Sequence, residues 1–132
     1  MDAALRAKLL GHAGLASLIA DMAWIDRPQA SALPFLTATK IAPGRNYAHD
    51  GWDGLNQTLV QFDIWAEKFS DVVAIDDQLT AAIEAPETVG GCQFIAAFQE
   101  AGHDAPPEDI PGGATVYRRI SEWRIYNSPS EG

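Results

Sequence analysis

The stretch "LNQTLVQFDIWAEKFSD", residues 55–71, contains the two periodicities from which the fold can be predicted. Between residues 58 and 66 the chain alternates, so that Val60, Phe62 and Ile64 share one face of a strand. Ser70 or Asp71 is then expected to cap a helix. Its apolar stripe, at spacings of three and four, consists of Val72, Ile75, Leu79, Ala82 and Ile83. The stretch therefore predicts a strand packed through one face and leading directly into an amphipathic helix.

The other face of this strand carries Leu59, Gln61, Asp63 and Trp65. An acid between two apolar residues could be a catalytic carboxylate or a structural one. A catalytic carboxylate needs a partner or a substrate proton within reach, and the sequence identifies none for Asp63. We therefore interpret Asp63 as a structural carboxylate that pairs with an arginine of a neighbouring strand or subunit.

The remaining elements follow from capping, turn and alternation patterns. Asp2 is expected to cap a first helix in which Leu5 and Leu9 lie one turn apart, and Gly11 to end or bend it, with further helical turns over 15–19. Residues 42–54 and 101–113 are dense in Gly, Asn, Asp and Pro, and are expected to be exposed loops. The expected extended segments are "MAWIDRP" (22–28), "LPFLTATKI" (33–41), "CQFIAAFQE" (92–100) and "ATVYRRISEWRIYN" (114–127).

This order of elements predicts an α+β domain. An antiparallel, possibly mixed, sheet of about four strands is covered on one face by an N-terminal helix and a central helix. The 132 residues are enough for one core, without a repeat or linker. We expect a single domain over residues 1–127 and a short flexible tail over 128–132.

Composition excludes several classes of function. The formal net charge of −9 leaves no uniformly basic surface for phosphates, so nucleic-acid binding is not expected as the main task. The single cysteine, Cys92, excludes an intramolecular disulfide and a multi-cysteine metal site. No apolar stretch is long enough to span a membrane, and the N-terminus is unlike a signal peptide. We expect a soluble protein made in the cytosol.

The candidates for chemistry are weak. His49, Asp50 and Asp53 could be imagined as metal ligands, but their spacing fits neither a calcium loop nor a zinc site, and turn chemistry explains them better. His103 and Asp104 could form a dyad that orients a catalytic base. The only candidate nucleophile is Cys92, which lies at the start of a strand. The glycines at 90, 91, 112 and 113 are expected in turns, and His12 at a helix boundary. We predict no catalytic residue, cofactor or metal.

The last strand has two mixed faces. Tyr117, Arg119, Ser121, Trp123 and Ile125 alternate with Arg118, Ile120, Glu122, Arg124 and Tyr126. Such a strand is typical of a sheet covered by helices on one side and by another protein on the other. Aromatic residues and arginine are enriched in interfaces. The interface candidates on the sheet are Asp63, Trp65, Arg119, Trp123, Arg124 and Tyr126.

Nearly the whole chain resembles the small tail-completion or tail-terminator family of long-tailed bacteriophages and gene transfer agents. The resemblance is carried by "DAALRAKLLGHAGLASLI", by "LPFLTATKI" with the Gly- and Asp-rich loop after it, and by "VQFDIWAEKFSDVVAIDDQLTAAIE" with the closing "YRRISEWRIYN". Its most telling part is "VQFDIWA" running into a helix near "FSD", joined to a last strand containing "EWRI". These are patterns of strand pleat and helix face.

The resemblance implies a structural virion protein and not an enzyme. It implies a homohexameric ring at the head-proximal end of the tail tube, which stops tube growth and offers a surface for head attachment. Expected partners are other copies of the chain, the major tail tube protein and a head-tail connector or stopper protein, and DNA would pass through the lumen without specific binding. The protein would assemble in the bacterial cytoplasm and reside in the neck of the tail, with no membrane.

In this picture the two loops recognise the partners. Residues 42–54, with Arg45, Tyr47 and Trp52, are expected to reach a neighbouring ring or the tube, since an exposed tryptophan is costly to leave in water. The 101–113 loop is a candidate for a second contact. Two alternatives remain open: another neck component, such as a head-completion or connector-adaptor protein, and a small cytosolic hydrolase that uses loop His and Asp residues.

Overall fold

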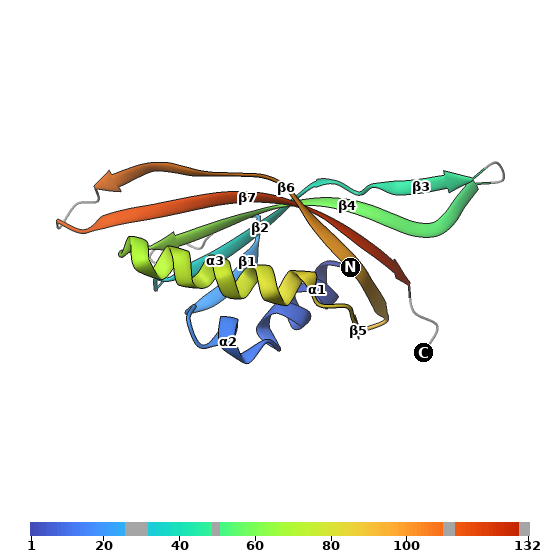
Figure 1. Cartoon of the computed structure of the whole chain (residues 1–132), viewed down its shortest axis with the longest axis horizontal. Helices are drawn as coiled ribbons and strands as arrows, with labels where there is room; N and C mark the ends of the chain where they lie inside the picture. Colours follow the sequence, from blue (N-terminus) through green and yellow to red (C-terminus); the bar gives the residue numbers. More distant parts are fainter. Residues whose placement is uncertain (26–31, 49–50, 110–112, 130–132) are drawn as a thin grey trace.

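A curved sheet with helices packed on one side forms the molecule (Figure 1). The computed structural model describes residues 1–25, 32–48, 51–109 and 113–129. The helices are α1 (Asp2–Leu10), α2 (Ala13–Ala16) and α3 (Phe69–Glu84). The strands are β1 (Asp21–Trp24), β2 (Phe35–Ala42), β3 (Arg45–Ala48), β4 (Gly51–Ala66), β5 (Glu87–Val89), β6 (Cys92–Asp109) and β7 (Thr115–Pro129). No helix in these ranges combines the length and hydropathy that a membrane span requires.

The sheet is mixed, and the predicted α+β class is confirmed. Its strand order is β1-β2-β4-β7-β6-β5, with β3 paired to β4. β1 runs parallel to β2, and the other pairs are antiparallel. The described residues contain seven strands instead of about four. β1 overlaps the expected extended segment 22–28, whereas β5 is too short to give a periodic signal and β3 lies in a segment expected to be a loop.

The core lies between the sheet and the helices, as the central stretch predicts. Val60, Phe62 and Ile64 of β4 are fully buried, which confirms the predicted core face. On α3 the buried residues are the predicted stripe, Val72, Ile75, Leu79, Ala82 and Ile83. β4 is paired on both edges, with β2 and with β7, so it is an interior strand of the sheet and its inward face lies at the centre of the core.

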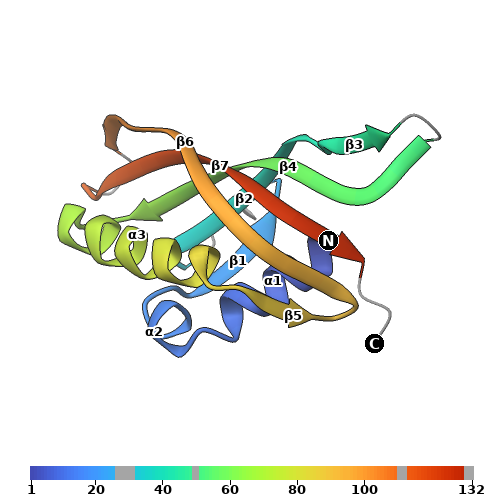
Figure 2. The same cartoon turned by 45° about the vertical axis from the view of Figure 1, so that its right-hand side comes forward.

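Both segments predicted as loops are mostly strands, and those predictions are corrected here. β3 and the start of β4 form a hairpin, the β3–β4 arm (residues 45–48 and 51–55), that projects from the body (Figure 2). β6 continues to Asp109 and pairs with β7 up to Thr115. The register shifts between Ala105 and Glu108, which leaves the two prolines between them outside the ladder. Cross-strand hydrogen bonds thus outweigh the turn-forming composition of both segments.

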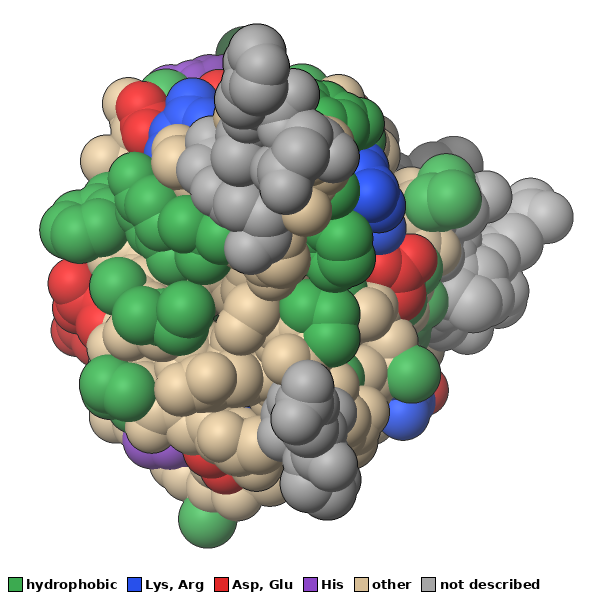
Figure 3. Space-filling view, turned by 90° about the vertical axis from the view of Figure 1, so that its right-hand side faces the viewer, with side chains coloured by type: hydrophobic (Ala, Val, Ile, Leu, Met, Phe, Trp, Pro, Cys, Tyr) green, Lys and Arg blue, Asp and Glu red, His purple; other side chains and the backbone are tan. Residues whose placement is uncertain are grey.

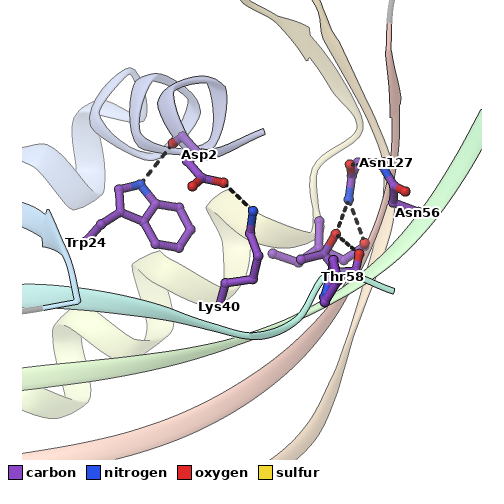
Figure 4. A network of polar contacts seen from close by, with 8 residues as sticks. Asp2, Trp24, Lys40, Asn56, Thr58 and Asn127 are labelled. Carbon is purple, nitrogen blue, oxygen red and sulfur yellow. Dashed lines mark hydrogen bonds and ion pairs between the residues drawn. The ribbon is translucent and has the colours of Figure 1, made fainter. Parts of the chain in front are cut away.

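The base of the β3–β4 arm is held by backbone and side-chain hydrogen bonds. Gly44 has a φ of 65°, and an added Cβ would lie 1.9 Å from the carbonyl oxygen of Gln57, so this position requires glycine. The backbone N–H of Gln57 donates to the Gly44 carbonyl at 2.7 Å, and Thr58 Oγ1 donates to the Pro43 carbonyl at 3.0 Å. The buried Asn127 of β7 donates to Thr58 Oγ1 at 3.0 Å (Figure 4). These contacts join the arm to the central strands.

The helix starts differ from the predicted caps. α1 begins at Asp2, and the Asp2 carboxylate forms an ion pair with Lys40 of β2 at 2.7 Å instead of capping the helix (Figure 4). α3 begins at Phe69 after Lys68, so Ser70 and Asp71 already lie inside its first turn. The C-terminal end of β7 also differs from the prediction, because the strand continues to Pro129, two residues into the segment 128–132 that was expected to be a flexible tail.

Lys8 links the N-terminal helix to the end of α3. Its ammonium group donates to the carbonyls of Ala82 and, at 2.7 Å, of Ala85, and the Glu87 carboxylate lies 3.7 Å away. These carbonyls have no partner within a helix, because the last turn always leaves its acceptors open. Burial lowers the pKa of Lys8, against the opposing effect of Glu87. Lys8 therefore closes the C-terminus of α3 from inside the protein.

Candidate assembly surface

In the part of the chain that the structure describes, no helix covers the face of the sheet opposite α1 and α3, here called the outer face (Figure 1). Trp65 of β4 lies opposite Arg118 of β7 in the register. The Arg118 guanidinium lies 4.5 Å from the centre of the Trp65 ring. Arg118 Nε donates to Asp63 Oδ2 at 3.0 Å, Nη2 donates to the same oxygen, and Gln61 Nε2 donates to Asp63 Oδ1 at 2.9 Å. Asp63 is thus paired with an arginine of a neighbouring strand, as one of the two predicted arrangements requires.

This cluster is fixed before any partner binds. The Asp63 side chain is 8% exposed although it lies on the outer face, because Arg118 and its neighbours cover it. The Trp65 indole donates to Thr37 Oγ1 of β2 at 3.3 Å. Side chains already held in one rotamer lose little conformational entropy on association. The outer face therefore presents a preorganised aromatic and cationic surface.

A second group of aromatic and charged side chains lies further along the outer face. Tyr126 of β7 and Phe98 of β6 form an edge-to-face pair with centroids 5.6 Å apart, and Phe98 is 57% exposed. Arg124 donates to Glu100 at 2.7 Å beside them. An exposed phenylalanine on a sheet is typical of a contact surface. The predicted candidates Arg124 and Tyr126 are thus on the outer face.

Two other predicted interface residues lie on the helix side of the sheet. Trp123 is 1% exposed and belongs to the core. Arg119 donates to Asp104 of β6 at 2.7 Å and to Asp76 of α3 at 3.2 Å. The hydrogen bond from Arg119 lowers the pKa of Asp104 and raises that of Arg119. Successive side chains of a strand point to opposite faces, so residues 119 and 123 cannot share the face of residues 118 and 124.

The β3–β4 arm brings together the three residues predicted for its segment. The Arg45 guanidinium lies 4.3 Å from the ring centre of Trp52 and 5.9 Å from that of Tyr47. Tyr47 is 67% exposed, whereas Trp52 is half-buried and its indole donates to the Leu55 carbonyl at 3.0 Å. Trp52 is therefore not an exposed loop tryptophan, because the arginine and its own strand cover part of it. The three side chains form one cation–π stack on the arm.

The end of the molecule that carries the arm is open to contact. Figure 3 views this end directly, and groups of hydrophobic side chains lie exposed on it, with charged side chains mostly near the rim. Exposed apolar groups of this kind are enriched in surfaces that bind other proteins.

The candidates for chemistry are not assembled into a site. His103 and Asp104 are consecutive on β6, so their side chains point to opposite faces, and Asp104 accepts from Arg119. Cys92 is buried, and burial raises the pKa of its thiol. His12, between α1 and α2, lies 3.3 Å from the side-chain oxygen of Gln78.

A metal site is likewise absent from the described part of the chain. Within the residues that the structure describes, no three His, Cys, Asp or Glu side chains gather around a point. His49 and Asp50 lie outside the described residues, and so does the side chain of Asp53. The turn glycines behave as predicted where they are described: Gly90 and Gly91 have φ of 55° and 76° between β5 and β6.

The sequence-based interface candidates omit several residues of the outer face, among them Gln61, Phe98, Arg118 and Glu122. The alternation of β7 places Arg118 and Glu122 on the same face as Arg124. If Trp123 is taken as a core residue, the opposite face of β7, which carries Arg118 and Glu122, is predicted to point outward. For Phe98 the sequence holds no such signal, because β6 changes register between Phe94 and Ala96 and again between Gln99 and Ala101.

Comparison with known proteins identifies the family. The family model for tail completion protein gp17 matches residues 3–129, nearly the whole chain. The chain belongs to this tail completion family. The resemblance seen in the sequence is thereby confirmed. Tail completion proteins are structural proteins of virions and not enzymes, and they act in contact with other tail or neck proteins.

The fold has a solved counterpart. A chain from a structure described as the virion of a native gene transfer agent particle superposes with a TM-score of 0.59, at 10% identity, over 97% of this chain and 95% of that one. A second solved chain, at 13% identity over 95% of both, has a TM-score of 0.48. No curated protein matches the sequence.

Proposed function

We propose that this tail completion protein forms a ring of six subunits at the head-proximal end of the tail tube. The ring ends tube growth and provides the surface to which the head is joined. The observation that carries the proposal is the two-sided sheet of a protein in this family: one face packs on its own helices, and the other presents Trp65, Arg118 and Tyr126 without a helix above them.

The architecture suits a subunit with different neighbours on different surfaces. The β3–β4 arm and the tip of the β6–β7 hairpin lie at opposite ends of the molecule (Figure 1). A head-to-tail contact between different surfaces generates a ring when its rotation closes. Arg45, Tyr47 and Trp52 on the arm, and Trp65, Arg124 and Tyr126 on the outer face, are the residue types that dominate interface energies. Asp63 orders the outer face, whereas Arg119 and Trp123 are left out of the proposed interface.

The proposed partners are the major tail tube protein on one side and a head-tail connector or stopper protein on the other. DNA passes through the lumen, and the net charge of −9 disfavours tight binding of its phosphates. The host particle is a phage or a gene transfer agent, in line with the particle from which the similar fold comes. Assembly takes place in the bacterial cytoplasm before the head is joined.

Electron microscopy of particles from a strain that lacks this gene tests the proposal. We expect filled heads beside detached tails, and tails longer than those of the parent strain. Complementation by the unaltered gene should restore tail length and joining. Normal, fully joined particles from the deletion strain would refute the proposed function. Detached tails of normal length would contradict the proposed role in ending tube growth and would support a role in head joining alone.

A further inference from the structure

The outer face contains a hollow of about 140 Å³ between β4, β7 and β6. Its lining residues are Gln61, Ala101, Gly102, His103, Ile120 and Glu122. Gln61 and Glu122 lie directly opposite each other in the register. Glu122 is half-buried and makes no ion pair with any residue in the described ranges. A carboxylate in a concave, partly apolar setting favours a cationic partner.

A matching cation lies on the β3–β4 arm. Arg45 is exposed, and its guanidinium is positioned by the rings of Trp52 and Tyr47. Arginine held on an aromatic surface is preorganised for bidentate pairing with a carboxylate. Trp52 and Tyr47 would add apolar contact around the charge.

The Arg45 side chain cannot reach Glu122 of its own subunit. Arg45 lies opposite Asn56 on β4, and Glu122 lies opposite Gln61, five residues further along the same strand. At about 3.3 Å per residue this separation is about 16 Å along β4. A pairing between the two residues therefore requires a second copy of the chain.

We propose that the β3–β4 arm of one subunit docks on the outer face of the next, with Arg45 paired to Glu122 in the hollow. The proposal rests on the proposed ring, and it names the surfaces that close it. Each subunit gives its arm to one neighbour and its hollow to the other, so the contact is heterologous and propagates around the ring. The occupant of the hollow is another copy of this chain.

Charge reversal in the producer strain tests the pairing. Arg45→Glu and Glu122→Arg are each expected to lower the yield of joined, infectious or transducing particles by about tenfold or more, and the double variant to recover most of it. Arg6→Glu, at an exposed ion pair on α1, is the matched control and should have little effect. Single variants with parental yield would overturn the proposal. The proposal would also be overturned if the double variant gave as few joined particles as the single variants while its purified subunit had the parental melting temperature.

Cross-linking gives a second readout that does not depend on the tolerance of position 122 for arginine. A chain with Arg45→Cys and Glu122→Cys is treated, in purified particles, with a short bis-maleimide. The native Cys92 is buried and serves as the internal negative control. A ladder beyond the dimer supports the proposal, and single-cysteine chains should give none. Monomers alone would overturn the proposed contact, and so would dimers alone, which would indicate two subunits that pair with each other reciprocally. Neither result would contradict the ring itself. The ring would be refuted by normal tails in the deletion strain.

Discussion

Replacing Asp63 with alanine should destabilise the folded subunit through the outer face. The change removes the acceptor for Arg118 and Gln61 and leaves a partly buried guanidinium over Trp65 without its carboxylate. Hydrogen bonds to charged groups contribute about 1.5–3 kcal/mol each. The Arg118 side chain is 32% exposed, so water can replace part of what it loses.

We therefore expect Asp63→Ala to lower the free energy of unfolding by about 2 kcal/mol. For a chain of this size the melting temperature should fall by about 8 °C. The assay is thermal and urea unfolding of the purified subunit, followed by circular dichroism. Glu67→Ala, an exposed acid just beyond β4, is the matched control and should change stability by less than about 0.5 kcal/mol.

A double-mutant cycle separates the ion pair from the loss of packing. Asp63→Ala, Arg118→Ala and the double variant should give a coupling energy of about 1–2 kcal/mol, because the two side chains share their hydrogen bonds. A coupling near zero would show that Asp63 acts through its volume or backbone alone, and the reasoning about a structural carboxylate would fail.

Four further changes probe other parts of the fold. Gly44→Ala should cost about 2–4 kcal/mol, since it strains the positive φ and forces apart the base of the arm; parental urea unfolding would contradict this. Lys8→Ala should cost about 1–3 kcal/mol by leaving buried helix carbonyls unpaired, to be measured in the same way; an unchanged midpoint would argue against the cap. The pKa of Asp104 is lowered by Arg119, so their pair stabilises the fold fully above about pH 4 and its contribution is lost as the pH falls through the lowered pKa. Accordingly, the stability difference between the parent and Arg119→Ala should shrink in acid, and a constant difference across pH would refute the pairing. Trp52→Ala should reduce incorporation into particles while the isolated subunit keeps its melting temperature; a large drop in that temperature would place Trp52 in the core.

Local pattern determined the central part of this protein. The alternation of Val60, Phe62 and Ile64 and the helical stripe that begins at Val72 each show which side of one element is apolar. An apolar side must be covered, so these two patterns sufficed to predict that α3 packs on β4. Together with the N-terminal helix, residues 33–41 and the last strand, these patterns carried the resemblance to the tail completion family, whose model matches residues 3–129.

The tertiary structure decided which strands pair and in what register. The arm and the extension of β6 are composed of turn-forming residues, and they are strands because a partner strand satisfies their backbone groups. The partner of Asp63, the burial of Trp123 and the turn of Arg119 toward α3 all depend on the alignment of β7 with β4. A pattern within one segment cannot specify this alignment, because the energy of a pairing belongs to two segments far apart in the sequence.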